Sequence, residues 1–167
     1  MDIIFNRRSV RKYTEQKIEP EKVDRMLRAA MQAPSATNQQ PWEFLVIDDK
    51  ETIVKLAEFS PYAKMLPGAP RAMVILEKQG MRAPLFTEQD LGAAVQNLML
   101  QAVEDGLGSV WMGVGRGTER EEFLTEMFNL PETVKPFAVL AIVYPADENA
   151  NKFVDRYDEA RVHYNKY

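Results

Sequence analysis

Apolar residues recur along the chain with two different spacings, and these spacings predict alternating helices and strands. The first long helix is predicted over residues 18–34, where Pro20 suits a first turn and Pro34 marks the exit. Its apolar positions share one helical face: Val23, Met26, Leu27 and Ala30. Two shorter helices are predicted at 50–59 and 119–130. Short apolar runs predict strands at 41–48, 71–77, 108–114 and 135–145. We expect strand 41–48 to be buried on both faces.

The segment 88–106 predicts a helix with an unusually wide apolar surface that ends at Gly106. Its apolar residues extend around more than one stripe: Leu91, Ala94, Val95, Leu98, Met99, Leu100, Ala102 and Val103. Such a helix needs two neighbours, one of which could be another subunit. Thr118 and Glu121 have the spacing of a capping box at the start of the next helix. The polar tail, residues 146–167, carries scattered aromatic residues and could be an arm that lies on another surface.

The net charge restricts what the chain can bind. With a formal charge of -4, the molecule as a whole repels nucleic acid and anionic membranes, so any phosphate must be bound by a local cluster of cations. The absence of cysteine excludes disulfides, thiolate nucleophiles and iron–sulfur clusters. No stretch approaches the roughly 20 apolar residues of a membrane span, and the start of the chain lacks a secretory pattern. We therefore expect a soluble, cytoplasmic protein that binds neither membranes nor nucleic acid.

Several catalytic motifs are absent. The glycines of GVGRGTER, residues 113–120, resemble a dinucleotide fingerprint, but Thr118 occupies the place of its third glycine. This stretch could be a flexible loop or a loop whose backbone lies against a flat ligand. The one histidine, His163, lies in the tail, and the chain contains neither H-E-x-x-H nor G-x-S-x-G. A chain without its own nucleophile or metal motif can take its chemistry from a cofactor.

Two stretches carry candidate binding residues. The basic segment, residues 7–13 with the sequence RRSVRKY, contains four cations. It could be a solvated face, or a phosphate site in which Ser9 adds a hydroxyl to planar guanidinium groups. The amide loop, residues 33–42 with the sequence APSATNQQPW, could be a turn with Asn38 left-handed and Trp42 in the core. Its small residues and amides would also suit the edge of an isoalloxazine ring.

Taken together, these stretches resemble the nitroreductase family of FMN-dependent oxidoreductases. The resemblance rests on RRSVRKY, APSATNQQPWEFLVI, LGAAVQNLMLQAVEDGLGSVWMG and FAVLAIVYP, and it covers nearly the whole chain. It implies an α+β fold with a mixed central β-sheet flanked by helices, in one FMN-binding domain spanning residues 1–167. It also implies an intertwined homodimer with FMN bound at the subunit interface.

The resemblance further assigns cofactor contacts to individual residues. Arg7, Arg8 and Ser9 would hold the FMN phosphate and ribityl chain, and Arg11 would lie near flavin N1 and O2. The tail would return Arg156, and with it Lys152, to the phosphate. The partner subunit would contribute the amide-loop residues Pro34, Ser35, Ala36 and Asn38. The other side of the isoalloxazine would be lined by Trp111, Met112, Gly113 and Val114.

The implied reaction is ping-pong transfer of two electrons from NADH or NADPH, through flavin N5, to a nitroaromatic or quinone-type acceptor. No protein side chain would be catalytic and no metal would be needed. Larger family members carry a glutamate at the position of Gly113, and they have an extra helical excursion that this chain lacks, so we expect a more open site. The alternatives are a family member acting on an enone, a flavin or a halogenated aromatic, and a dimer that stores or senses flavin without significant turnover.

Overall fold

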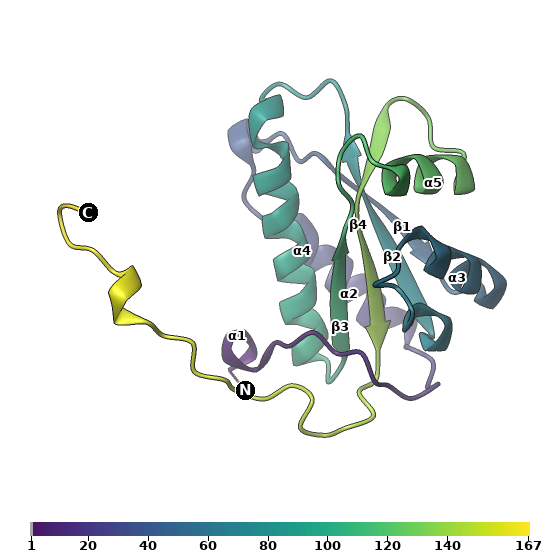
Figure 1. The fold of residues 1–167 in the computed structure, drawn as a ribbon, viewed down its shortest axis with the longest axis horizontal. Coiled ribbons are helices and arrows are strands. Elements are labelled where there is room, and N and C mark those ends of the chain that lie inside the picture. The colour runs from purple at the N-terminus through teal and green to yellow at the C-terminus, as the bar shows by residue number, and fades with distance from the viewer. Residues whose placement is uncertain (1) are drawn as a thin grey trace.

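The computed structural model describes residues 2–167, which form an α+β structure around a single sheet (Figure 1). The strands lie in the order β1-β2-β4-β3. Their bounds are β1 Trp42–Ile47, β2 Arg71–Lys78, β3 Gly108–Gly113 and β4 Val134–Val143. All three pairings between these strands are antiparallel. The strands therefore form an antiparallel sheet, whereas the resemblance implied a mixed one; a parallel bridge between Ser9 and Ser109 lies outside the strands.

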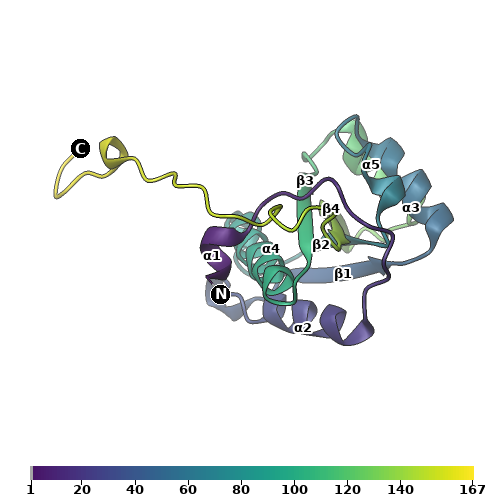
Figure 2. The same cartoon turned by 90° about the horizontal axis from the view of Figure 1, so that it is seen from below.

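Helices cover both faces of the sheet (Figure 2). One face packs against α2 (Pro20–Met31) and α4 (Thr87–Glu104), and the other against α3 (Lys50–Leu56) and α5 (Glu119–Met127). A short helix, α1 (Ile3–Asn6), precedes the basic segment. None of the helices in residues 2–167 is long and apolar enough to cross a membrane.

The central strands explain why two cores form. In β2, Met73 and Ile75 face the core beneath α2 and α4, whereas Ala72 and Val74 face the core beneath α3. Successive side chains of a strand point to opposite faces, so a continuous apolar run is buried on both sides. The strand β4 alternates in the same way, and both strands are buried almost throughout.

Two local predictions need correction. The strand β1 is at one edge of the sheet, and Glu43 and Val46 are exposed, so burial on both faces was wrong. The capping box also differs, because the Glu121 carboxylate accepts from the Gly117 N–H at 2.6 Å and the Thr118 hydroxyl donates to a carbonyl of the preceding loop. Other local predictions are confirmed, since α2 begins at Pro20 and Gly106, with φ of +75°, follows the end of α4.

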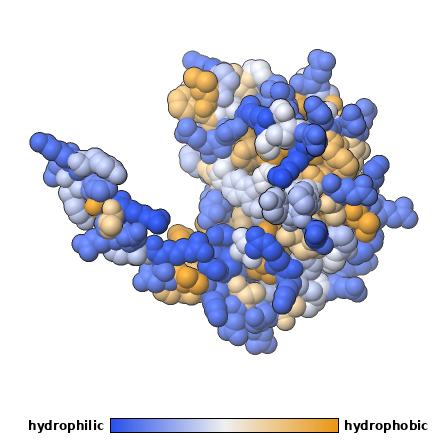
Figure 3. Space-filling view, viewed as in Figure 1, coloured by the Kyte–Doolittle hydropathy of each residue, from blue (hydrophilic) through white to orange (hydrophobic). Residues whose placement is uncertain are grey.

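The tail leaves the body of the molecule after β4 (Figure 1). Residues 152–167 are exposed, and their surface is mostly hydrophilic, whereas the body shows apolar surface on the same face (Figure 3). Several contacts fasten the start of the tail: the Ala146 N–H donates to the Lys12 carbonyl at 3.1 Å, the Asn151 amide donates to the Leu107 carbonyl at 3.0 Å, and the rings of Phe153 and Phe5 meet edge to face at 5.4 Å. The tail of a single chain therefore lies against α1 and then extends away, and its predicted role as an arm stays a prediction.

Candidate functional site

The basic segment crosses the edge of the sheet beside β3. The Val10 N–H donates to the Ser109 carbonyl at 2.9 Å, and the Val10 side chain is buried in the core. This close approach depends on Gly108, because a Cβ at that position would lie only 2.7 Å from a Val10 methyl carbon. A glycine at the start of β3 thus fixes the position of the basic segment.

Burial of Val10 determines which neighbouring side chains face outward. Successive residues of an extended chain point in opposite directions, so Ser9 and Arg11 are directed away from the core, and both are exposed. A second bridge, between Tyr13 and Pro145, holds the far end of the segment. The Tyr13 hydroxyl also donates to the Met65 carbonyl, and burial raises the pKa of that hydroxyl to about 12.

The first arginines of the segment line a cleft of about 360 Å³, here called the arginine cleft. Its cations are Arg7, Arg8 and Arg156, and its remaining walls come from α1 and residues 153–157 of the tail. The pKa of Arg7 is lowered by burial, and to a lesser extent by the charges of Arg8 and Arg156. Within residues 2–167, none of these three arginines forms an ion pair. Asp155 also lines the cleft, so three cations share it with one carboxylate, and a phosphate would neutralise the excess positive charge.

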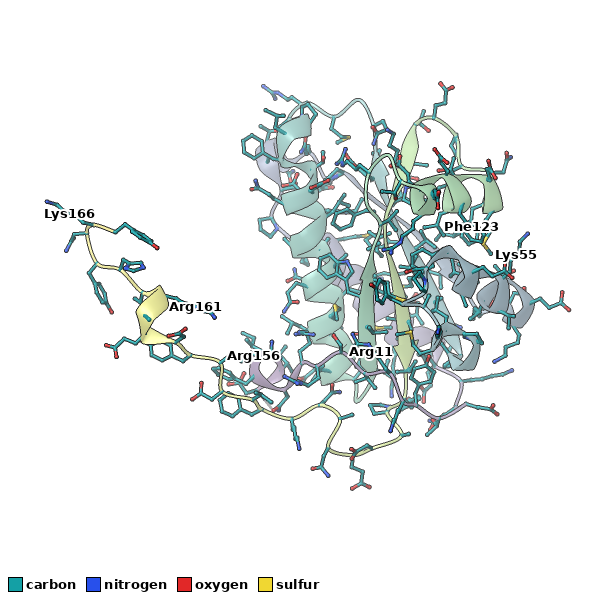
Figure 4. All side chains as sticks on the ribbon, viewed as in Figure 1. Arg11, Lys55, Phe123, Arg156, Arg161 and Lys166 are labelled. Atoms are coloured by element: carbon teal, nitrogen blue, oxygen red, sulfur yellow. The ribbon has the colours of Figure 1, made fainter. Side chains whose placement is uncertain are left out.

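Arg11 lines a different cleft of about 470 Å³, here called the strand cleft. Figure 4 shows Arg156 beside α1 and Arg11 where the N-terminal segment crosses the sheet. One wall is β3, which supplies Val110, Trp111, Met112 and Gly113. The Ser109 carbonyl of β3 accepts from Val10, but beyond it β3 pairs only with β4 among the strands, so backbone groups along the rest of its outer edge are free to meet a ligand. The remaining lining residues are Ser60, Tyr62, Met65 and Arg120.

The amide loop is held by a buried carboxylate on α4. Asp90 is 5% exposed, and it accepts from the Ala36 N–H at 2.9 Å and from the Gln39 side-chain amide at 2.7 Å. Three of the loop residues have positive φ, at 53° for Thr37, 55° for Asn38 and 48° for Gln40. Backbone strain of this kind persists only where the surrounding structure enforces it. The prediction of a left-handed Asn38 is confirmed, and Trp42 is buried as expected.

Within one chain, the predicted cofactor residues fall into four groups. Arg7, Arg8 and Arg156 share the arginine cleft, and Arg11 shares the strand cleft with Trp111, Met112 and Gly113. A third group consists of residues that are next to cleft-lining residues in the sequence. Ser9 directly follows Arg8, Val114 directly follows Gly113, and Lys152 directly precedes Phe153. The fourth group is the amide loop, whose residues also line neither cleft: Pro34, Ser35, Ala36 and Asn38.

This fold and sequence match known proteins over most of their length. The sequence profile of the nitroreductase family matches residues 4–144. The chain belongs to the nitroreductase family. A relative from Archaeoglobus fulgidus, provisionally named an NADH dehydrogenase/NAD(P)H nitroreductase, is 37% identical over 170 residues, covering 100% of this chain and 98% of that protein. An FMN reductase (NAD(P)H) of Bacillus subtilis is 31% identical over 168 residues, covering 89% of this chain and 67% of that protein.

Solved structures agree with the family assignment. A Clostridium acetobutylicum protein provisionally named an NADH oxidase has a TM-score of 0.95 at 50% identity, covering 99% of this chain and 100% of that one. A protein of Desulfovibrio desulfuricans, provisionally named a nitroreductase and solved in complex with FMN, has a TM-score of 0.82 at 30% identity, covering 99% and 95% of the two chains. The nitroreductase fold expected from the sequence motifs is thereby confirmed.

The structure adds a polar network behind the loop that joins β3 to α5, residues 114–118, in this nitroreductase-family chain. Arg116 contacts the Glu77 carboxylate at 2.6 Å and the Glu88 carboxylate at 2.5 Å, and Glu77 also accepts from the Thr87 hydroxyl. The Glu77 side chain is only 8% exposed, although it lies in an apolar strand. This network fastens the loop that follows Gly113 to β2 and α4. Sequence reasoning missed it, although a glutamate ending an apolar run was a usable signal.

Proposed function

We propose that this member of the nitroreductase family is an FMN-dependent oxidoreductase that transfers two electrons from NADH or NADPH to nitroaromatic or quinone-type acceptors. The observation that carries the proposal is the placement of cations by the basic segment. It directs Arg7 and Arg8 into the arginine cleft and Arg11 into the strand cleft. The α-carbons of Arg7 and Arg11 lie at most roughly 14 Å apart, since an extended residue spans at most about 3.6 Å. One short backbone stretch thus serves two parts of one elongated ligand.

The arginine cleft suits the phosphate end of FMN. A phosphate monoester accepts bidentate hydrogen bonds from guanidinium groups, and three such groups meet there without an ionic partner among the described residues. Ser9 is exposed on the same segment, and its hydroxyl can donate to a phosphate or ribityl oxygen. Binding an anion would also relieve the repulsion from Arg8 and Arg156, which adds to the larger effect of burial in lowering the pKa of Arg7.

The strand cleft suits the isoalloxazine end. Its wall offers Trp111 and Met112 for apolar contact, and it offers the outer backbone edge of β3 for hydrogen bonds to the polar rim of the ring. When bound, FMN supplies hydride acceptance at N5 and returns two electrons to a second substrate, in a ping-pong reaction. Arg11 places a permanent positive charge beside the ring, where it favours the anionic reduced form and raises the reduction potential.

We further propose that the amide loop completes the site of a second subunit in a homodimer. In one chain, Pro34, Ser35, Ala36 and Asn38 line neither cleft, so they reach a flavin only if another copy supplies it. The strained backbone of the loop, held by buried Asp90, supports a role in binding, because strain is retained where it serves a site. The apolar residues of α4 do not provide the contact surface, because most of them are buried within one chain against α2 and the sheet.

The deciding experiment is an anaerobic titration of the purified protein, followed by its visible absorption spectrum. We expect flavin bands that bleach on addition of NADH or NADPH and recover on addition of nitrofurazone or menadione. A protein that remains colourless after incubation with excess FMN and desalting would refute the proposal. Stable flavin bands that no nicotinamide nucleotide reduces would instead favour the storage or sensing alternative.

The role of Arg11 has its own test. Replacing Arg11 with alanine should lower the flavin midpoint potential more than it weakens FMN binding, because the side chain faces the strand cleft and not the arginine cleft. Replacing Arg7 and Ser9 together with alanine is the matched comparison, and it should release FMN from a folded protein. An unchanged flavin midpoint potential in Arg11→Ala would mean that Arg11 does not lie beside the flavin ring.

A further inference from the structure

A second cation, Arg120, lines the strand cleft opposite the basic segment. It comes from the first turn of α5, whereas Arg11 comes from the N-terminal segment. The residues that line this cleft include no aspartate or glutamate, so its wall carries two positive charges on a protein with net charge -4. The isoalloxazine proposed above requires one cation, beside N1 and O2. Arg120 is therefore left without a role in that assignment.

The position of Arg120 is electrostatically unfavourable for helix α5. The N-terminus of a helix carries partial positive charge and favours acidic residues, which Glu119, Glu121 and Glu122 supply in the same turn. Within residues 2–167, however, Arg120 forms no ion pair with them or with any other carboxylate. Glu121 is instead engaged with the Gly117 N–H and with Lys135. A cation at this place without an acidic partner among the described residues is available to an anionic ligand.

Tyr62 holds the Arg120 guanidinium at the mouth of the cleft. The guanidinium carbon lies 5.6 Å from the centroid of the Tyr62 ring, within the range of a cation–π contact. Tyr62 is 71% exposed, which places the pair at the rim and not in the floor. A cation–π contact of this kind leaves the N–H groups of a guanidinium able to donate. The Arg120 guanidinium at the rim can therefore bind an anionic group that enters from solvent.

We propose that Arg120 and Tyr62 form a subsite for a phosphate or carboxylate group on the molecule that exchanges electrons in the strand cleft. The inference rests on the proposed function and adds the substrate chemistry to it. Two sources have this chemistry, namely the additional ribose phosphate of NADPH and an acidic group on the acceptor. Arg120 is a specificity-determining residue in either case, and it has no part in holding FMN.

The test is steady-state kinetics of the FMN-loaded protein with Arg120→Gln. NADH is compared with NADPH at fixed menadione, and nitrobenzene is compared with para-nitrobenzoate at fixed NADH. One charge-assisted hydrogen bond corresponds to roughly a 10-fold effect or more. We expect kcat/KM to fall by about that factor for NADPH or for para-nitrobenzoate, while the uncharged or less charged member of the pair changes by less than about two-fold. Arg120→Lys should recover part of the loss, because it keeps the charge without the planar fork.

A matched control separates local from general effects. Arg28→Gln removes the same charge from an exposed position on α2, outside both clefts. It should leave unchanged the kcat/KM ratio of NADPH to NADH and that of para-nitrobenzoate to nitrobenzene. Selective loss for NADPH assigns the subsite to the nucleotide, and selective loss for para-nitrobenzoate assigns it to the acceptor. Equal changes of kcat/KM for both members of each pair, or loss of FMN from Arg120→Gln, would overturn this inference but not the proposed function. A wild-type protein with neither FMN nor NADH–menadione turnover would overturn the proposed function as well.

Discussion

Replacing Gly108 with alanine tests how the basic segment is positioned. The new Cβ would lie 2.7 Å and 3.0 Å from the two Val10 methyl carbons and 2.8 Å from the Val10 Cβ. All three atoms belong to one β-branched side chain with little rotamer freedom, so rotation cannot relieve the contact. The Val10 N–H is also bound to the Ser109 carbonyl at 2.9 Å. The backbone of the segment must therefore move away from β3.

The expected magnitude follows from overpacking. Added methyl groups in a packed core typically cost about 1–3 kcal/mol. For a chain of this size, 1 kcal/mol lowers Tm by roughly 2–4 °C, which gives a decrease of about 2–12 °C. The shift also displaces the arginines on either side of Val10. Loss of a single charge-assisted hydrogen bond to phosphate would weaken FMN binding roughly 10-fold or more.

Thermal unfolding at saturating FMN, followed by circular dichroism, measures the decrease in Tm. A fluorescence titration measures the loss of FMN affinity. Gly113→Ala is the stability control at the other end of β3, because a Cβ there meets no atom within 4 Å and its φ is not positive. Because Gly113 lines the strand cleft, this control is compared with the wild type in the absence of FMN, where we expect its Tm to stay close to that of the wild type. If Gly108→Ala kept wild-type Tm and FMN affinity, the segment would not be fixed by this contact.

Three further predictions concern polar groups. Arg116→Met should lower the free energy of unfolding, measured in urea, by about 2–3 kcal/mol, because it leaves the buried Glu77 carboxylate without its cation. Glu88→Gln, at the exposed partner of Arg116, should lower it by less than about 1 kcal/mol, and equal losses in the two variants would contradict this prediction. Burial keeps Tyr13 protonated to a pKa of about 12, above the ordinary value near 10, so its contribution to stability is complete below pH 10 and disappears as pH rises to about 12. Tyr13→Phe should make the decline of Tm between those pH values shallower, and an identical decline would refute the assignment. Asp90→Asn should increase amide hydrogen exchange in the amide loop, measured by mass spectrometry, and unchanged exchange would mean that the loop is held by other contacts.

The sequence predicted elements whose pattern is local. The proline at position 20 begins α2 and Gly106 ends α4, because backbone chemistry at single residues determines where these helices begin and end. Burial of β1 was mispredicted because the sequence does not show whether an apolar strand has one neighbour or two. Apart from Glu43, the residues at 42–47 are apolar, yet the edge position of this strand leaves Val46 exposed.

The candidate site was predicted through a family resemblance, and its supporting contacts were not. The pattern of RRSVRKY alone did not distinguish a solvated face from a phosphate site. The outward position of Ser9 and Arg11 depends on Val10 packing against Gly108, which is almost 100 residues away in the chain. The same holds for Glu77 and Arg116, which meet only because β2 and the loop after β3 are brought together by the sheet. Contacts between distant residues have no local signature in sequence.

The bridge between Ser9 and Ser109 also has a consequence for solubility. The strand β3 is at an edge of the sheet, and an uncovered edge offers unpaired N–H and C=O groups to another chain. The basic segment covers the start of this edge and surrounds it with positively charged side chains, which discourage pairing between copies. A cofactor that keeps the segment in place therefore also keeps the edge covered. Loss of FMN and a tendency to aggregate are expected to occur together in this protein.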